Sequence, residues 1–227
     1  MSWVASERYR VRQAPDGLAL VQELLNTRGI KEYAPDLLAG HESAEEWLTG
    51  AAEAWARVRG LDVPDCSLSA SDPATLRDLR SVFEELVAMA GDGTPAAGRA
   101  EPDARVRLAP DSRGQVRMIP SGRGAQWLEA ALWSETLLAQ RAGVWARLKL
   151  CRNSECRSAF YDTSRNNSGV WHDVRVCGNA ANLRASRERR RARESDPATG
   201  PAAPAADPLA GPAPRTALGP GAGPAEG

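Results

Sequence analysis

Residues Cys151 to Arg193 read CRNSECRSAFYDTSRNNSGVWHDVRVCGNAANLRASRERRRAR, and they hold three of the chain's four cysteines and one of its two histidines. Cys151 and Cys156 are separated by four residues, as are His172 and Cys177, and a loop of fifteen residues joins the two pairs. A structural zinc ion takes four such ligands in a tetrahedron, and two close pairs joined by a loop of this length can supply them. The spacing therefore predicts a structural Zn²⁺ site formed by these four side chains.

Two other arrangements of the cysteines are open. Three buried, reduced cysteines beside an unrelated histidine form one of them, because cysteine buries readily as a small hydrophobe. A disulfide is the other, although it would leave one thiol of the segment unpaired and nothing else in the sequence indicates an oxidising compartment. The segment is polar and basic with few aliphatic residues to form a core, which favours a metal cross-link.

Charge is spread unevenly along the 227-residue chain, although the formal net charge is zero. Residues 145–193 hold twelve Lys or Arg and four Asp or Glu, a net of +8, so the rest of the chain carries −8. A basic end on an acidic body indicates an anionic partner, and nucleic acid is the usual candidate. The predicted nucleic-acid contacts are Arg184, Arg187, Arg190 and Arg191 of the helix expected after Cys177, and Arg165 of the loop between the two ligand pairs.

Membrane and secretion signals are missing from the sequence. No stretch approaches 18 consecutive apolar residues, which predicts that no helix crosses a membrane. The N-terminus, MSWVASERYRVRQAP, lacks the apolar region of a secretory signal. We therefore expect a cytoplasmic chain, in a reducing compartment where thiolates bind metal rather than form disulfides.

The residues before the zinc ligands predict a mostly helical domain with one β-hairpin. Residues 1–14 read as a polar lead-in. Apolar spacing predicts helices over residues 18–28, 43–59, 72–90 and 124–142, the second opened by a capping box of Ser43 and Glu46. Strands over 105–108 and 115–119 flank the turn signal at 111–114 and predict the hairpin. Cys66 lies far from the other cysteines and is interpreted as structural.

These elements give an α+β fold in three parts. Residues 1–144 form the helical domain, 145–193 the zinc finger with its basic helix, and 194–227 a tail rich in Pro, Ala and Gly. The tail has very few large apolar side chains to offset the entropy of ordering it, so we expect it to be disordered.

Cys151 to Arg193 resembles the CGNR-type zinc finger, a treble-clef-like module. The resemblance rests on Cys151-x₄-Cys156, the loop Phe160-Tyr161-Asp162-x-Ser164-Arg165-Asn166, Trp171, and Cys177-Gly178-Asn179 with the arginine-rich helix. Upstream, LAL at 18–20 through NTR at 26–28 is similar to the start of the ABATE domain, which usually precedes this finger. The family is regarded as stress-related bacterial transcription regulators. The resemblance therefore implies a DNA-binding regulator whose N-terminal domain serves sensing or dimerisation.

Two departures from the family pattern affect these expectations. His172 stands where the family has a cysteine directly after the tryptophan. Imidazole is a normal zinc ligand and the spacing to Cys177 is kept, so the site is expected as Cys₃His, with a metal affinity sensitive to acid. Ala180 stands where the family's arginine follows Cys-Gly-Asn, and Gly169 and Val170 stand where members are often basic. These changes reduce the anion-binding surface that the resemblance implies.

Two further functions compete with DNA binding. A protein-interaction module would use the same arginines against an acidic partner, such as a protein of the transcription machinery. A second copy of the chain is a partner that either function allows. A zinc enzyme would need an open coordination position and a nearby carboxylate base, for which Asp173 is the candidate. Four protein ligands close the coordination shell, and no catalytic motif stands upstream, so we expect no enzyme.

Overall fold

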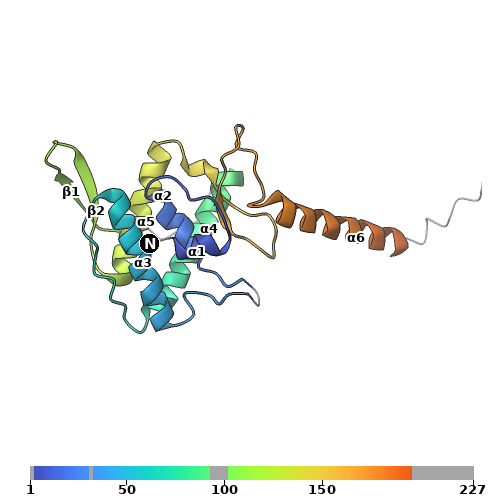
Figure 1. Ribbon diagram of the computed structural model, residues 1–227, viewed down its shortest axis with the longest axis horizontal. Helices are drawn as coiled ribbons and strands as arrows, with labels where there is room; N and C mark the ends of the chain where they lie inside the picture. Colours follow the sequence, from blue (N-terminus) through green and yellow to red (C-terminus); the bar gives the residue numbers. More distant parts are fainter. Residues whose placement is uncertain (1–2, 31–32, 93–101, 196–227) are drawn as a thin grey trace, which may run out of the picture. The chain divides into compact units, whose positions relative to one another are not determined.

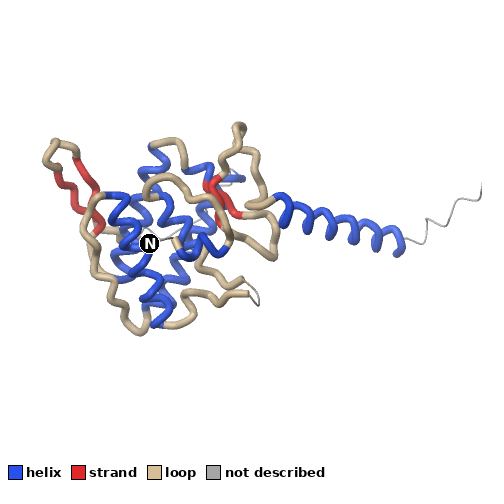
Figure 2. The backbone as a smooth tube through the Cα atoms, viewed as in Figure 1, coloured by secondary structure: helices blue, strands red, loops and turns tan. Residues whose placement is uncertain are grey.

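The computed structural model describes residues 3–30, 33–92 and 102–195, and Figure 1 shows its elements along the chain. The helices are α1 (Val4–Arg8), α2 (Leu18–Leu25), α3 (His41–Arg59), α4 (Asp72–Asp92), α5 (Gly124–Arg141) and α6 (Asn179–Ser195), with a 3₁₀ turn η1 (Trp145–Arg147) and a π-helical turn η2 (Val174–Gly178). The strands are β1 (Val106–Pro110), β2 (Val116–Pro120), β3 (Leu148–Leu150) and β4 (Ala159–Tyr161). Helices dominate and the strands form two small antiparallel hairpins (Figure 2), which confirms the mixed helix and strand class. The expected disordered tail lies, from residue 196 on, outside the described residues.

The described chain falls into two compact units, which divide between Leu183 and Arg184. The first unit contains the elements from α1 to η2 and the start of α6, and the second contains the rest of α6. Within the first unit, Leu148 of β3 and Ala159 of β4 are buried in the same hydrophobic cluster as helices α2 to α5. The zinc-binding segment therefore shares a core with the helices before it. The domain boundary at residues 144 and 145 stays a prediction.

Helix α2 lies at the centre of the first unit, and all eight of its residues are buried. It contacts α1, α3, α4, α5 and β4. A helix covered on every side must satisfy its polar side chains with protein partners, because a buried polar group without a hydrogen bond is costly. Gln22 Oε1 accepts a hydrogen bond from Ala14 N at 2.7 Å. The Glu23 carboxylate accepts from Ala5 N and Ser6 N at 2.6 and 2.9 Å.

The segment before α2 is folded onto the core, so the prediction of a polar lead-in is wrong for the described residues 3–14. Trp3, Ala5 and Tyr9 are buried, and α1 forms one short helix there. The carboxylate that accepts from the first turn of α1 belongs to Glu23, eighteen residues beyond Ala5. A cap supplied from so far along the chain leaves no local signal in the sequence.

Two helix ends differ from their predicted positions. Helix α2 ends at Leu25 rather than at residue 28, because Thr27 Oγ1 donates to Leu24 O at 2.6 Å and the side chain of Asn26 turns to β4. Helix α3 begins at His41, and the predicted capping box is absent. The Ser43 hydroxyl donates to a carbonyl oxygen of the preceding turn at 3.2 Å instead of accepting from a backbone N–H.

The first hairpin confirms its prediction. Strands β1 and β2 pair from Val106 opposite Pro120 to Pro110 opposite Val116, across a turn in which Gly114 has a left-handed φ of 74°.

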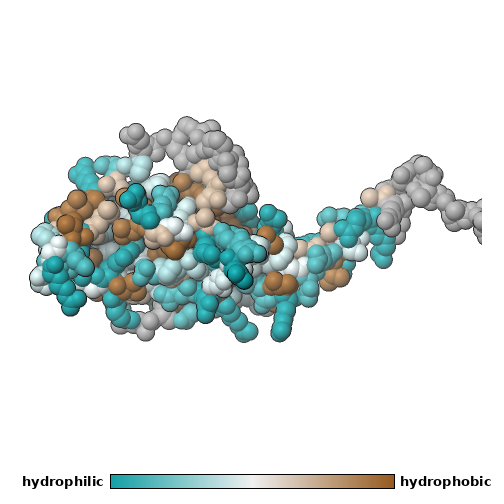
Figure 3. Space-filling model, turned by 90° about the horizontal axis from the view of Figure 1, so that it is seen from above, coloured by the Kyte–Doolittle hydropathy of each residue, from teal (hydrophilic) through white to brown (hydrophobic). Residues whose placement is uncertain are grey.

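Figure 3 shows hydrophobic residues at several separate places among hydrophilic ones on the face drawn. Cys66 is buried in the main core, as expected of a structural cysteine. Among the described residues, no helix is both long and apolar enough to cross a membrane.

Candidate metal centre

The β3–β4 hairpin positions the first two cysteines. Its strands pair from Leu148 opposite Tyr161 to Leu150 opposite Ala159. Cys151 directly follows β3, and Cys156 lies in the loop before β4. The Cys151 N–H donates to a carbonyl across the hairpin, and the Cys156 N–H donates to Asn153 O, both at 2.8 Å. These bonds form a tight knuckle that holds both cysteines on one side of the hairpin.

The second pair of ligands comes from the turn that leads into α6. His172 precedes η2, and Cys177 lies within it. Asp173 caps this turn, because its Oδ1 accepts hydrogen bonds from Arg175 N at 2.7 Å and Val176 N at 3.2 Å. Cys177 is therefore held on a short rigid turn that continues directly into α6 at Asn179.

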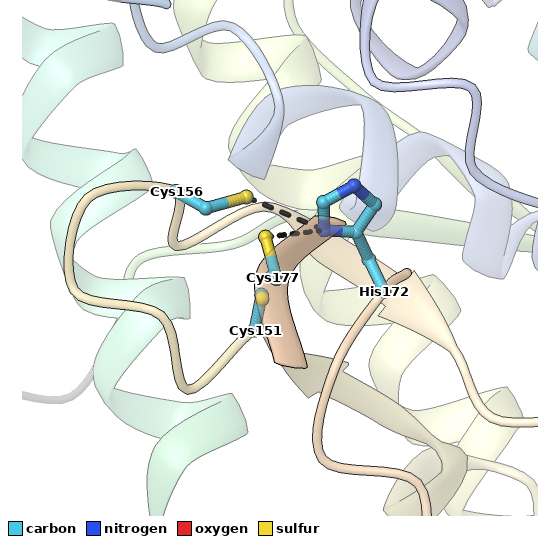
Figure 4. A group of neighbouring side chains, drawn as sticks. All are labelled: Cys151, Cys156, His172 and Cys177. Carbon is cyan, nitrogen blue, oxygen red and sulfur yellow. Dashed lines mark hydrogen bonds between the residues drawn. The ribbon is translucent and has the colours of Figure 1, made fainter. Parts of the chain in front are cut away.

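The four predicted ligands meet at one point (Figure 4). Their ligand atoms all lie within 4.8 Å of one another. His172 Nδ1 lies 3.4 Å from Cys156 Sγ and 3.6 Å from Cys177 Sγ. A tetrahedral zinc ion with its usual bond lengths separates a sulfur and a nitrogen ligand by about 3.6 Å. The distances and the donor atoms thus fit a structural zinc ion, which Cys151, Cys156, His172 and Cys177 would hold.

The distribution of protons among the three thiols also fits a zinc site. The hydrogen bond with Cys156 raises the pKa of the Cys151 thiol, and burial raises it further. The same bond lowers the pKa of the Cys156 thiol, and burial raises the pKa of Cys177. A negative sulfur is thus stabilised beside two buried thiols, whose protons a zinc ion would displace. All four cysteines of the chain are free of disulfides, and Cys66 is not part of the group.

Two polar side chains around the ligands were not found by the sequence analysis. Asn153 is 7% exposed, and its Nδ2 donates to Cys177 Sγ at 3.2 Å. Ser158 is buried, and its Oγ lies 3.3 Å from Cys156 Sγ. When that sulfur is a metal-bound thiolate, the hydroxyl becomes the donor. Such partners orient metal ligands and tune their basicity. In the sequence, only the position of Asn153 between Cys151 and Cys156 points to this role.

A second, smaller hydrophobic cluster surrounds the site. It contains Cys151, Phe160 and Cys177, with Trp171 and Val11 packed against it. Both aromatic residues belong to the motif that carries the family resemblance. The contribution of the N-terminal segment was not predicted. Besides Val11, the ring of Tyr9 meets that of His172 edge-on, with centroids 6.5 Å apart.

A buried ion pair orders the loop between the two ligand pairs. Lys149 Nζ lies 2.8 Å from Asp162 Oδ2, and their side chains are 17% and 4% exposed. Burial alone would raise the pKa of the Asp162 carboxyl, but Lys149 and hydrogen bonds from Ser164 and Gly169 lower it well below its usual range. Lys149 also donates to the carbonyl oxygens of Asn167 and Gly169 at 2.6 and 3.1 Å.

The predicted nucleic-acid contacts lie in both units. Arg165 is exposed on the ordered loop of the first unit, whereas Arg184, Arg187, Arg190 and Arg191 belong to the second. Arg184 is half-buried, and the other three are exposed on α6. Their contact with DNA stays a prediction.

The comparison with protein families agrees with the metal site. Residues 147–190 match the family model described as the CGNR zinc finger. A search of curated proteins gives no match to the chain. The match begins within η1, just before β3, and it includes all four ligands and the first part of α6. Residues 147–190 are therefore a CGNR zinc finger whose side chains fit a structural zinc ion.

Proposed function

We propose that this chain is a DNA-binding transcription regulator in which the zinc site fixes the base of an arginine-rich helix. The observation that carries the proposal is the direct continuation of η2, which holds Cys177, into α6. A metal bond to Cys177 anchors the start of the helix. Exposed arginines at 187, 189, 190 and 191 then form a basic segment on it. Arginine pairs well with phosphate oxygens, and such contacts supply most of the non-specific affinity for DNA.

The other parts of the proposal follow from the same arrangement. The finger takes the form of a treble clef, with the knuckle in the β3–β4 hairpin and the last ligand in the turn before α6. The helical residues 1–144 act as an ABATE-like domain for sensing or dimerisation in the cytoplasm. The zinc ion is structural rather than catalytic. The four protein ligands and the use of the Asp173 carboxylate as a cap both support this assignment.

The salt dependence of DNA binding tests the proposal. The double substitution Arg187→Ala and Arg191→Ala should reduce the slope of log affinity against log salt by about 1.8, since each lost phosphate contact removes about 0.9. Arg107→Ala with Arg113→Ala, on the exposed hairpin, removes the same charge and serves as the control. The slopes are measured by fluorescence anisotropy with a labelled duplex. Equal slopes for the two variants would remove α6 from the binding surface.

A protein-docking role is the second candidate, and one observation favours it. Val174 and Val176 are 67% and 63% exposed in η2, the turn that also holds the ligand Cys177. Exposed apolar residues close together are typical of a surface that binds another protein. Nucleic acid that co-purifies with the zinc-loaded chain and is released by salt would favour DNA binding. Docking would be favoured by a different result. No nucleic acid would co-purify, and a protein that co-purifies with the wild type would be lost from the variant with Val174→Ser and Val176→Ser.

A further inference from the structure

A cavity of about 320 Å³ lies beside the zinc ligands, within the first unit. Four segments line it: the C-terminal part of α4, the end of β3, the knuckle that begins at Cys151, and the loop that ends at Val170. One of its lining residues is the zinc ligand Cys151 itself. The wall that the knuckle forms is therefore held in place by the metal site.

Two arginines of the lining each follow a zinc ligand directly in the sequence. Arg152 follows Cys151, and Arg157 follows Cys156. Their backbone N–H groups donate to carbonyl oxygens of the loop and the knuckle at 3.0 Å each. Arg157 also has a left-handed φ of 52°, which the knuckle imposes. The metal and these bonds fix the points at which both side chains leave the backbone, which lowers the entropy lost on binding a ligand.

The cavity is positively charged. Its lining contains Lys149, Arg152 and Arg157, and none of the lining residues that the structure describes is a carboxylate. Asp162 neutralises Lys149 from outside the cavity. Arg152 and Arg157 are both exposed, and neither pairs with a carboxylate anywhere in the ranges that the structure describes. Three thiolates on one zinc ion give the site a formal charge of about −1, which balances only one of the two arginines.

We propose that this cavity is a phosphate-binding site, and that the phosphate it takes is one from a nucleic-acid backbone. The statement that this phosphate belongs to a nucleic acid rests on the proposed function. Two guanidinium groups match the oxygens of a phosphate with paired, charge-assisted hydrogen bonds. The hydroxyl of the exposed Ser168 adds a third donor to the lining. Val87 and Ala88 of α4 add apolar surface to the lining, which suits an adjoining sugar.

A purely structural role for the two arginines predicts a different outcome. If they served only to balance the charge of the zinc thiolates, their loss would weaken zinc binding and leave anion binding unchanged. The phosphate site predicts the reverse: zinc is retained and anion binding is lost. Zinc content and anion binding must therefore be measured on the same variants.

A titration of the full-length, zinc-loaded protein with inorganic phosphate tests the cavity without any nucleic acid. Ionic strength is held constant with chloride. We expect saturable shifts of backbone amide resonances at residues 151–157 and 167–170. The shifts should vanish in Arg152→Gln with Arg157→Gln and persist in the control Arg107→Gln with Arg113→Gln. Non-saturable shifts in the wild type, or saturable shifts that survive in the zinc-loaded variant, would overturn the inference.

The salt slope for duplex DNA tests the source of the phosphate. Arg152→Gln with Arg157→Gln should lower the slope by about 1.8, for two contacts. Arg152→Lys with Arg157→Lys should keep the slope but bind more weakly, because lysine lacks the planar fork. A normal slope in the glutamine variant, with a reduced slope in the α6 variant, refutes the nucleic-acid source and leaves the proposed function intact. If the wild type binds no duplex at all, the proposed function fails, and the phosphate titration still decides the cavity.

Discussion

The side chain of Asn26 hydrogen-bonds both backbone polar groups of Ala159. Asn26 Nδ2 donates to Ala159 O at 3.0 Å, and Ala159 N donates to Asn26 Oδ1 at 2.8 Å. Gln22 Nε2 also donates to Ala159 O, at 3.3 Å. The amide of a helix residue thus pairs with β4 as a neighbouring strand would. This contact joins the central helix α2 to the zinc-binding hairpin across 133 residues of sequence.

Removal of this contact should destabilise the whole first unit. Asn26→Ala leaves the buried Ala159 N–H without this acceptor and removes one side-chain donor from the Ala159 carbonyl oxygen. We therefore expect a loss of about 3 kcal/mol in the free energy of unfolding. Asn166→Ala, in an exposed loop position, should change it by less than about 0.5 kcal/mol. Urea unfolding of the zinc-loaded proteins measures both. A loss confined to the finger, with the core helices unaffected, would contradict the prediction.

Zinc affinity should depend on the amide that faces Cys177. Asn153→Ala removes the hydrogen bond to that sulfur, and partners of this kind are worth about 10–100-fold in metal affinity. Ser154→Ala, on the exposed side of the same knuckle, should leave the affinity unchanged. Competition with a fluorescent zinc chelator gives both values. Similar affinities for the two variants would mean that Asn153 shapes the knuckle without tuning the ligand.

The buried pair of Lys149 and Asp162 should be costly to break. Lys149→Met leaves a carboxylate that is 4% exposed without its cation, which should lower stability by about 3 kcal/mol. Without Lys149, the pKa of the Asp162 carboxyl is higher than in the wild type, so this group takes up a proton more readily. The loss should therefore be smaller at pH 6 than at pH 8. Denaturation at the two pH values measures it, and Asp162→Asn in the Lys149→Met background should recover part of it. A loss independent of pH would argue against a buried charge.

Two glycines should respond to alanine in opposite directions. A Cβ atom at Gly17 would overlap the Glu135 carboxylate, which is 2% exposed and held by Trp55 Nε1 at 2.7 Å and by Arg59. Gly17→Ala should therefore cost at least about 2 kcal/mol. At Gly50, inside α3, an added Cβ meets nothing within 4 Å. Gly50→Ala should stabilise the protein by about 0.5–1 kcal/mol, because alanine loses less entropy in a helix. Thermal unfolding distinguishes the two.

The parts of the structure that could be predicted have local causes. The zinc ligands follow from two Cys/His pairs of equal spacing, and the hairpin of β1 and β2 follows from turn residues between alternating apolar positions. Helices α4 and α5 begin at their predicted residues because apolar side chains recur there at helical spacing. In each case, the residues that determine the structure lie within a few turns of one another.

The parts that could not be predicted depend on residues far apart in the sequence. Glu23 caps α1, Asn26 pairs with Ala159, and Val11 packs beside the zinc ligands. Nothing in a single sequence distinguishes such an asparagine from one that merely ends a helix. The cationic cavity shows the same limit. Arg152 and Arg157 are visible as charges, but only the fold places both of them around one space.

The contacts of Ala159 and Leu148 with the main core extend the influence of the metal beyond the finger. Both residues are buried in the cluster that α2 to α5 form, so the hairpin that carries Cys151 and Cys156 cannot separate without exposing that core. A ligand that binds only the folded chain stabilises it by mass action, and each tenfold rise in free zinc above the dissociation constant adds about 1.4 kcal/mol. The supply of zinc in the cell would then set how much of the entire helical unit stays folded, and with it how long the chain survives proteolysis.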